Sequence, residues 1–563
     1  MTELAPRVLI IGLDSATFDL IEPWAAQGYL PQLARLMAEG AHGPLASTLQ
    51  PTTAPAWTTF MTGVNQGQHG LYDFVRRRAG SYNVEVTNST HVKAPTFFEI
   101  ASQYGQRVIS VNMPYTFPPR AVNGVMVGGP FAPAFTREVV YPPELFETIK
   151  ALAPDYFILT EYNPRATDPR AAYAQALLHE VELRENVAAH LMQTQLWDVC
   201  AVVTMATDEV QHTFWQCLTV ADDDPLAPYR DVIREVYQRI DRMIGHLIEL
   251  AANDGTGRPT TVMILSDHGA GDLRWMINLN QWLAEAGYLK FQTEKTGALK
   301  NARARSMQRL MHAYKRMLPS SWREAIRVRL GAQRFHRLKG EFESALVTAV
   351  VDWTQTRAYS LGAGGNIFVN LAGREPQGVI QPGAEYEQVR TELIAQLQQL
   401  SDPETGAPIV ACVHRREEIY HGEELEYAPD LIVRWRDHAC WGRGLYGNQT
   451  PVFEAQRQFD FSDQPLSGTH RPEGILILWG AAIRSGERIT GARLLDLAPT
   501  ILKLLNLPVP EIMDGRALAV VANSPEQATF ETPLKLKQAA TEHDYTPEEE
   551  ALITQHLKDL GYL

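Results

Sequence analysis

The segment RVLIIGLD at residues 7–14 decides the fold of this chain. After Arg7 it is apolar without interruption up to Leu13, which is typical of a strand buried on both faces of a parallel sheet. Asp14 ends the segment with a carboxylate. Because ligands of open α/β sheets collect beyond the carboxyl ends of the strands, the segment predicts an α/β fold with functional side chains at that edge.

Buried strands and helices alternate along the first half of the chain. Further strands are predicted at 107–112 (RVISVN), 198–205 (DVCAVVTM) and 260–265 (TTVMIL), and helices at 31–39, 171–196 and 229–252. This alternation predicts a mostly parallel central sheet that is sandwiched by helices and joined by right-handed crossovers. Near the end of the chain, residues 474–479 (GILILW) return to this sheet and 494–505 form a closing helix.

Changes in composition divide the chain into five expected regions. These are a first part of the catalytic core at 1–289, a basic helical insertion at 290–345, an α+β cap region at 346–435, a closing part of the core at 436–520, and a polar tail with a terminal helix at 521–563. The stretch 290–340 is rich in Lys and Arg and poor in acids. Its simplest interpretation is a solvated helix, and the alternative is peripheral contact with an anionic membrane or a polyanionic substrate.

The composition limits the class of protein. The chain has 563 residues and a formal net charge of −14, which argues against a general nucleic-acid binder. It contains no run of the ~20 apolar residues that a membrane-spanning helix needs. The short apolar run at 8–13 lacks the flanking features of a signal peptide. We therefore expect a soluble cytoplasmic protein without specific nucleic-acid binding, and the oligomeric state stays open.

Carboxylates and imidazoles follow the predicted strands. Asp208 and His212 are four residues apart, so on a helical turn they share one face and can grip one ion, although such a pair is equally suited to a surface contact. Asp267 and His268 directly follow another strand. Asp14 and His470 are weaker candidates alone, because Asp is a common turn or cap residue and a lone His in a loop is usually not a ligand.

A threonine is the candidate nucleophile. It lies in QPTTAPAWTTFMTG at residues 50–63, where Thr53 precedes Pro55 by two positions. A divalent metal lowers the pKa of bound water from about 16 to about 7 and can activate an alcohol in the same way. A helix that starts near Pro55 would also direct backbone N–H groups at a bound anion. A capping role for Thr53 fits the local sequence as well, and Thr52 is a competing nucleophile.

Together these motifs resemble the alkaline phosphatase superfamily, and within it the type I phosphodiesterases and nucleotide pyrophosphatases. Seven positions follow that family's chain order: Asp14, Thr53, Asp208, His212, Asp267, His268 and His470. The order Thr-x-Pro, Thr-Gly and His-Gly within 53–70 resembles the family's nucleophile segment and selects Thr53 over Thr52. The segment 498–515 resembles its closing helix and loop.

The resemblance implies a hydrolase with two divalent ions, typically zinc, with manganese or iron as alternatives. One ion would be held by Asp14, Thr53, Asp267 and His268, and the other by Asp208, His212 and His470. The implied reaction is cleavage of a small-molecule phosphate ester through a covalent phospho-threonine, first of all as a phosphodiesterase or nucleotide pyrophosphatase. The alternatives are a phosphomonoesterase or phosphomutase acting on small metabolites, and a lipid head-group phosphotransferase at a membrane surface.

Two positions depart from the family's pattern. The family's Asn after His-Gly, which helps to hold the phosphoryl oxygens, corresponds here to Phe74. We expect Asn112 or Arg76 to bind substrate in its place, with the neighbouring 77–78 as further candidates. Trp57 stands where sulfatases of the superfamily carry an Arg, which argues against sulfate esters as substrates.

Overall fold

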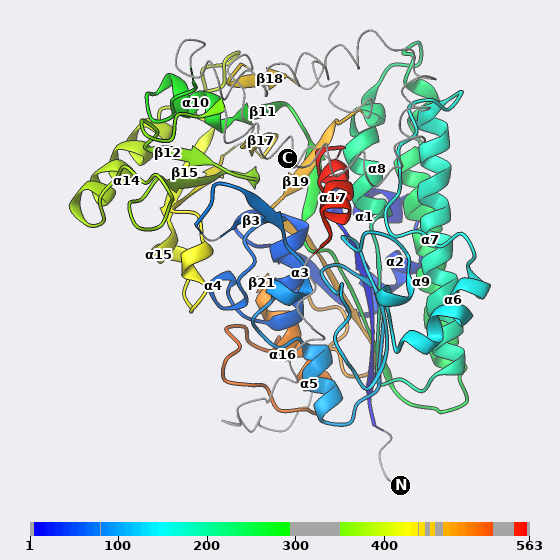
Figure 1. Ribbon diagram of the computed structural model, residues 1–563. Helices are drawn as coiled ribbons and strands as arrows, with labels where there is room; N and C mark the ends of the chain where they lie inside the picture. Colours follow the sequence, from blue (N-terminus) through cyan, green and yellow to red (C-terminus); the bar gives the residue numbers. More distant parts are fainter. Residues whose placement is uncertain are drawn as a thin grey trace, which may run out of the picture.

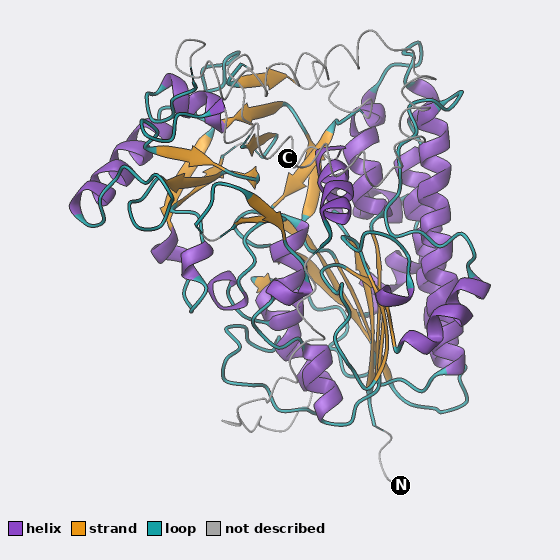
Figure 2. Ribbon diagram, in the orientation of Figure 1, coloured by secondary structure: helices purple, strands orange, loops and turns teal. Residues whose placement is uncertain are grey.

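The computed structural model of the chain, shown in Figures 1 and 2, describes residues 5–78, 80–292, 350–436, 438–444, 451–455, 465–521 and 545–559. Most of the basic insertion predicted at 290–345 lies outside these ranges, so its helical structure stays a prediction. Among the described residues, no helix is both long and apolar enough to cross a membrane.

A nine-stranded sheet forms the centre of the molecule, with the order β21-β2-β20-β9-β1-β8-β5-β6-β7. Its strands are β1 (Arg7–Leu13), β2 (Ala41–Ala46), β5 (Val108–Met113), β6 (Gly124–Gly128), β7 (Val140–Tyr141), β8 (Val199–Thr204), β9 (Thr260–Leu265), β20 (Glu473–Trp479) and β21 (Ala492–Arg493). The five strands from β9 to β6 are mutually parallel, whereas β20 and β7 pair antiparallel on either side of them. The mostly parallel sheet predicted from the sequence is therefore confirmed.

Helices cover both faces of this sheet (Figures 1 and 2). One face carries α1 (Phe18–Ala26), α2 (Pro31–Glu39), α6 (Phe146–Leu152), α7 (Pro169–Thr194) and α9 (Val232–Ala252), and the other carries α3 (Thr53–Thr62), α5 (Phe97–Gln103) and α16 (Leu497–Leu504). Strand β1 shows why its sequence is uniformly apolar. Val8 and Ile10 enter the core on the side of α3, while Leu9 and Ile11 enter the core on the side of α7.

Two smaller sheets lie beside the central one. The first has the order β12-β14-β16-β15 and falls within the predicted α+β cap region, packed against α14 (Ala384–Leu397). Its strands are β12 (Ala358–Ser360), β14 (Asn366–Val369), β15 (Val410–Arg415) and β16 (Leu431–Trp435). The second, β13-β17-β11-β18, takes strands from three of the predicted regions: β11 (Trp275–Asn278), β13 (Ala363–Gly364), β17 (Cys440–Arg443) and β18 (Phe453–Ala455). The region boundaries themselves stay a prediction.

Short elements connect these layers. They are β3 (Val75–Arg77), β4 (Val84–Val86), β10 (Gly269–Asp272), β19 (Gly468–Arg471), α4 (Gln66–His69), α8 (Ala206–Phe214), α10 (Leu279–Glu285), α15 (Arg416–Ile419) and α17 (Pro547–Asp559). The helix predicted at 229–252 begins three residues later, at Val232, after a 3₁₀ turn at Ala227–Tyr229. The closing helix predicted at 494–505 opens likewise with a 3₁₀ turn, Leu494–Asp496.

Candidate metal centre

The register of two neighbouring strands brings the first pair of carboxylates together. Gly12 of β1 pairs with Leu265 of β9, so Asp14 and Asp267 each lie two residues beyond this pair. Parallel neighbours are about 4.8 Å apart, so side chains that leave the sheet at the same level meet each other. Asp14, Asp267 and His268, called here the acidic triad, are all fully buried. The Nε2 atom of His268 lies 3.2 Å from Asp267 Oδ2 and 3.7 Å from Asp14 Oδ1.

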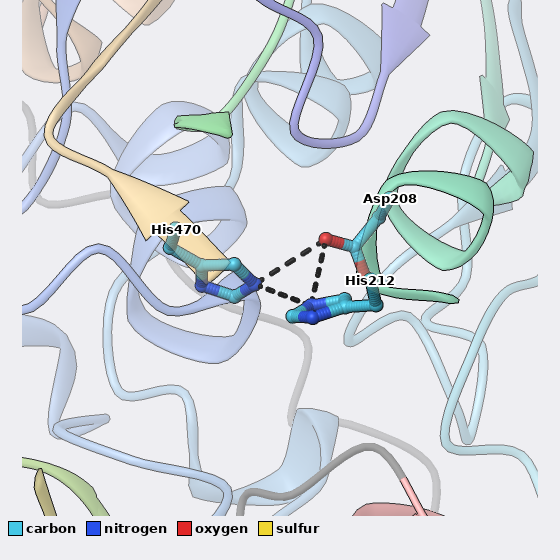
Figure 3. A group of neighbouring side chains, drawn as sticks. All are labelled: Asp208, His212 and His470. Carbon is cyan, nitrogen blue, oxygen red and sulfur yellow. Dashed lines mark hydrogen bonds and ion pairs between the residues drawn. The ribbon is translucent and has the colours of Figure 1, made fainter. Parts of the chain in front are cut away.

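A second triad comes from α8 and β19 and is called here the histidine triad (Figure 3). As predicted from their spacing, Asp208 and His212 share one face of a helix, with Asp208 Oδ1 and His212 Nε2 3.2 Å apart. His470 approaches from β19, so that its Nε2 lies 3.3 Å from Asp208 Oδ1 and 3.0 Å from His212 Nε2.

The structure corrects the local environment expected for His470. The sequence predicts a loop at this residue, but His470 belongs to β19, which pairs antiparallel with β10 so that His470 stands opposite Ala270. His268 lies two residues before Ala270, and its ring stacks on that of His470 with the centroids 3.7 Å apart. The two triads are therefore adjacent.

Backbone carbonyls fix the proton on each imidazole. The Nδ1 atoms of His212, His470 and His268 donate to the carbonyls of Gly468 (2.9 Å), Pro51 (2.6 Å) and Gly269 (3.2 Å) respectively. A carbonyl oxygen only accepts, so each Nδ1 carries a hydrogen, and the neutral form of each ring turns the lone pair of Nε2 toward its triad. Such outer contacts are the usual means by which proteins orient metal-binding histidines.

The spacing of the ligand atoms suits divalent metal ions. Four ligands arranged tetrahedrally about 2.1 Å from zinc are themselves about 3.4 Å apart, and the triad atoms are 3.0 to 3.7 Å apart. Four buried ligand atoms also have no hydrogen-bond partner among the described residues: Asp14 Oδ1, Asp208 Oδ1, Asp267 Oδ2 and His268 Nε2. Lone pairs that face one another in a buried site are stable only when protons or a metal cation lie between them.

The carboxyl groups of the two triads differ in their proton affinity. Burial, reinforced by the charges of Asp267 and Asp208, raises the pKa of Asp14 well above its ordinary value, and burial likewise raises the pKa of Asp267. Burial also opposes ionisation of Asp208, but His212 and His470 outweigh it and hold the pKa of Asp208 well below its ordinary value. Asp208 in turn outweighs the effect of burial on His212 and raises the pKa of that imidazole.

Thr53 is the first residue of α3 and is buried, and both triads contact the chain close to it. Pro51, two residues before, accepts the hydrogen bond from His470, and Trp57, four residues after, donates to Asp14. The helix starts at Thr53 itself, two residues earlier than Pro55, where it was expected. The competing Thr52 is the N-cap residue, and its buried hydroxyl has no hydrogen-bond partner among the described residues.

The two candidate substrate-binding residues already have partners within the protein. The side-chain amide of Asn112 donates to the carbonyl of Val203 at 2.9 Å, while its Oδ1 has no hydrogen-bond partner among the described residues. Arg76 pairs with Glu85 at 2.6 Å and lies over the ring of Tyr427. Their roles toward substrate stay predictions. Arg77 and Arg78 also form ion pairs, and Phe74 is fully buried in the core.

The contact between Trp57 and the acidic triad was not predicted from the sequence. The indole N–H donates to Asp14 Oδ2 at 2.7 Å, with both side chains fully buried. The residue was considered only as a departure from the sulfatase pattern. Its aromatic character and its place four residues after Thr53 were visible, but the register of α3 against β1 was not.

The position of the terminal helix was also not foreseen. α17 is anchored through Tyr545, whose hydroxyl donates to the carbonyl of Phe131 at 2.7 Å, and through the fully buried Ile553 and Leu557. Burial lowers the pKa of His556 on this helix to about 4, and the charge of Asp208 opposes that shift. Helix α17 therefore packs within electrostatic reach of the histidine triad.

The protein is thus an α/β protein with a mostly parallel, helix-covered sheet and two candidate ligand triads beyond the central strands of that sheet. Residues 8–328, more than half of the chain, match the family model described as type I phosphodiesterase / nucleotide pyrophosphatase, and the chain belongs to this family. It is accordingly a hydrolase of phosphoric esters.

Similar solved structures come from bacteria and animals. A phosphonoacetate hydrolase from Sinorhizobium meliloti 1021, in complex with phosphonoformate, is 14% identical and has a TM-score of 0.49, with 88% of this chain and 94% of that chain covered. Human ectonucleotide pyrophosphatase / phosphodiesterase 5 is 13% identical and has a TM-score of 0.47, with 92% of this chain and 100% of that chain covered. No curated protein sequence matches the chain.

Proposed function

We propose that this hydrolase cleaves phosphodiester or nucleotide pyrophosphate bonds by using two divalent ions and a covalent intermediate on Thr53. One observation carries the proposal: two adjacent buried triads point oxygen and nitrogen lone pairs at each other across 3.0 to 3.7 Å. The family membership supports the same reaction class.

The donor set assigns residues to each ion. Asp14, Asp267 and His268 would hold one ion together with the hydroxyl of Thr53, and Asp208, His212 and His470 would hold the other. Mixed carboxylate and imidazole ligands favour zinc, with manganese or iron as alternatives. When bound, such ions lower the pKa of a coordinated hydroxyl or water and neutralise charge on the phosphoryl oxygens.

Thr53 performs the first chemical step of the proposal. Its Oγ atom gives up the hydroxyl proton to solvent and forms a bond to phosphorus, while the bond from phosphorus to the leaving oxygen breaks and that oxygen takes up a proton. In the second step water attacks the phospho-threonine and the bond from Oγ to phosphorus breaks. Oγ takes up a proton from the attacking water, and a phosphate monoester is released. The backbone N–H groups of Thr53 and Ala54 precede the first hydrogen bond of α3, so they would be available to a phosphoryl group bound at this end of the helix.

Several expectations about surroundings and partners remain predictions. The contact with an anionic membrane was assigned to 290–340, and nearly all of that stretch lies outside the described residues. The cytoplasmic location and the absence of specific nucleic-acid binding rest on the sequence alone.

A paired rate assay on the zinc-loaded protein tests the proposal. It compares bis-p-nitrophenyl phosphate, a diester, with p-nitrophenyl phosphate, a monoester, for the wild type and for Thr53→Ala and Thr52→Ala. We expect faster turnover of the diester and its loss in Thr53→Ala. A preference for the monoester would replace the proposal with a phosphatase or phosphomutase activity. Turnover that survives in Thr53→Ala and disappears in Thr52→Ala would make Thr52 the nucleophile.

A further inference from the structure

Trp57 connects the helix of the proposed nucleophile to a proposed metal ligand. It follows Thr53 by four residues on α3, so the two side chains lie on the same face, one turn apart. Its indole Nε1 donates to Asp14 Oδ2 at 2.7 Å. A hydrogen bond to an ionised acceptor in a buried site is stronger than one between neutral groups, and both residues here are fully buried.

The neighbouring backbone holds the indole in place. A Cβ atom added to Gly12 of β1 would lie 2.5 Å from Cη2 of Trp57, which is closer than two carbon atoms can approach. Phe60 packs edge-on against the same ring, with the ring centroids 5.5 Å apart. The ring therefore fills its space on the strand side, and only a glycine at position 12 leaves room for it.

This contact makes the two oxygens of Asp14 different. Oδ2 accepts the indole hydrogen, whereas Oδ1 is buried, has no hydrogen-bond partner among the described residues and lies 3.7 Å from Nε2 of His268. A carboxylate without such a donor could rotate and offer either oxygen or both. With Oδ2 held by the indole, Oδ1 is the oxygen that points into the acidic triad.

We infer that Trp57 is a positioning residue, which turns Asp14 so that one oxygen alone faces the acidic triad and which fixes the nucleophile helix relative to that ligand. The inference rests on the proposed function, because it assumes that a divalent ion binds the acidic triad. Trp57 acts through Asp14 and does not contact the substrate. Its indole N–H therefore contributes to ion affinity and to turnover, and leaves substrate binding nearly unchanged.

The substitution Trp57→Phe removes the N–H and keeps most of the ring. Trp275→Phe is a matched control, because its indole donates to another aspartate, Asp402 Oδ2, at 3.0 Å in the second small sheet. Zinc is titrated into each full-length variant against a competing chelator. Loss of a partner that orients a metal ligand typically costs 10- to 100-fold in affinity. We expect Trp57→Phe to lose this much affinity for one of its two ions and Trp275→Phe to lose none. In Trp57→Phe, kcat should fall while KM stays within about threefold of the wild-type value.

Failure of this inference can be told apart from failure of the proposed function. If the wild type binds no zinc at the triads, the proposed function fails. If the wild type binds two ions and Trp57→Phe binds both with unchanged affinity, the inference alone is overturned. Unfolding temperatures in excess chelator reveal a folding defect of Trp57→Phe. In that case Trp57→His, which restores a ring N–H, decides: recovered affinity supports the inference, and affinity as weak as that of Trp57→Phe contradicts it.

Discussion

The carboxyl groups of the acidic triad and of the histidine triad have pKa values that are shifted in opposite directions. Asp14 and Asp267 share their triad with the neutral His268, and burial raises the pKa of both carboxyl groups, with the charge of Asp208 adding to the shift in each. Asp208 is buried as deeply, but His212 and His470 keep its pKa low. The histidine triad can thus form an internal ion pair, whereas the acidic triad must take up protons or a cation. A bound divalent ion therefore relieves more repulsion in the acidic triad.

The largest expected effect comes from the proposed nucleophile. Thr53→Ala removes the proposed nucleophile and leaves all six carboxylate and imidazole ligands in place, so kcat/KM should fall at least about 1000-fold. Metal content, measured by elemental analysis of the purified variant, should stay at two ions. A variant that retains more than a tenth of wild-type turnover would show that the hydroxyl of Thr53 does not attack phosphorus.

Removing one ligand from each triad in turn distinguishes the two proposed ion sites. Asp14→Ala should lose the ion of the acidic triad, and His212→Ala should lose the ion of the histidine triad. Residues that only orient a metal ligand typically contribute up to roughly 100-fold to activity, so the loss of a ligand itself should lower activity by more than that. Elemental analysis should find about one ion per chain in either variant. Two ions retained in both variants would rule out these triads as the binding sites.

The pH dependence of the free energy of unfolding, measured on the metal-free protein, tests the difference between the two triads further. Folding raises the pKa of Asp14 and Asp267, so the folded chain binds more protons than the unfolded chain, and the free energy of unfolding falls as pH rises above about 4. The pKa of His212 is raised as well, so its contribution is complete below about 6.5 and is lost as pH rises above that value.

Urea unfolding in excess chelator from pH 4 to pH 9 measures these two windows. Asp14→Asn should flatten the lower part of the profile, and His212→Ala should flatten the upper part. Saturating zinc should stabilise the wild type most at neutral and alkaline pH, where both triads have lost protons. A profile that both substitutions leave unchanged would mean that neither triad is a charged centre in the folded protein.

The smallest expected effect lies outside both triads. Arg76 was predicted to bind substrate, but its guanidinium pairs with Glu85 and lies over Tyr427, so Arg76→Gln should change KM for the diester by less than about threefold. Steady-state kinetics of Arg76→Gln, measured alongside Asn112→Ala at the other predicted substrate contact, check this expectation. A rise in KM of about tenfold or more for Arg76→Gln would support the substrate contact that the sequence suggested.

The sequence predicted the features that depend on local pattern. β1 is apolar from Val8 to Leu13 and β9 from Val262 to Leu265. Asp14 and Asp267 follow these strands within two residues, so strand pairing alone brings the two carboxylates together. The spacing of Asp208 and His212 predicted their shared helix face in α8.

Features that depend on distant partners were not predictable. His470 looked like a loop residue, because the four-residue β19 has no apolar run and exists only through its pairing with β10. The contact of Trp57 with Asp14 depends on the packing of α3 against β1, and a carboxylate accepts a hydrogen bond from any donor that packing supplies. The strands of the second small sheet are likewise two to four residues long and come from distant segments.

An anomalous difference map at the zinc absorption edge, from crystals of the full-length protein grown with zinc, tests the central claim most directly. We predict two peaks. One should lie about 2.0–2.2 Å from Asp208 Oδ1 and from the Nε2 atoms of His212 and His470. The other should lie at the same distance from Asp14 Oδ1, Asp267 Oδ2 and His268 Nε2. Peaks outside both triads, or a single peak at zinc saturation, would contradict a two-ion centre built by these residues.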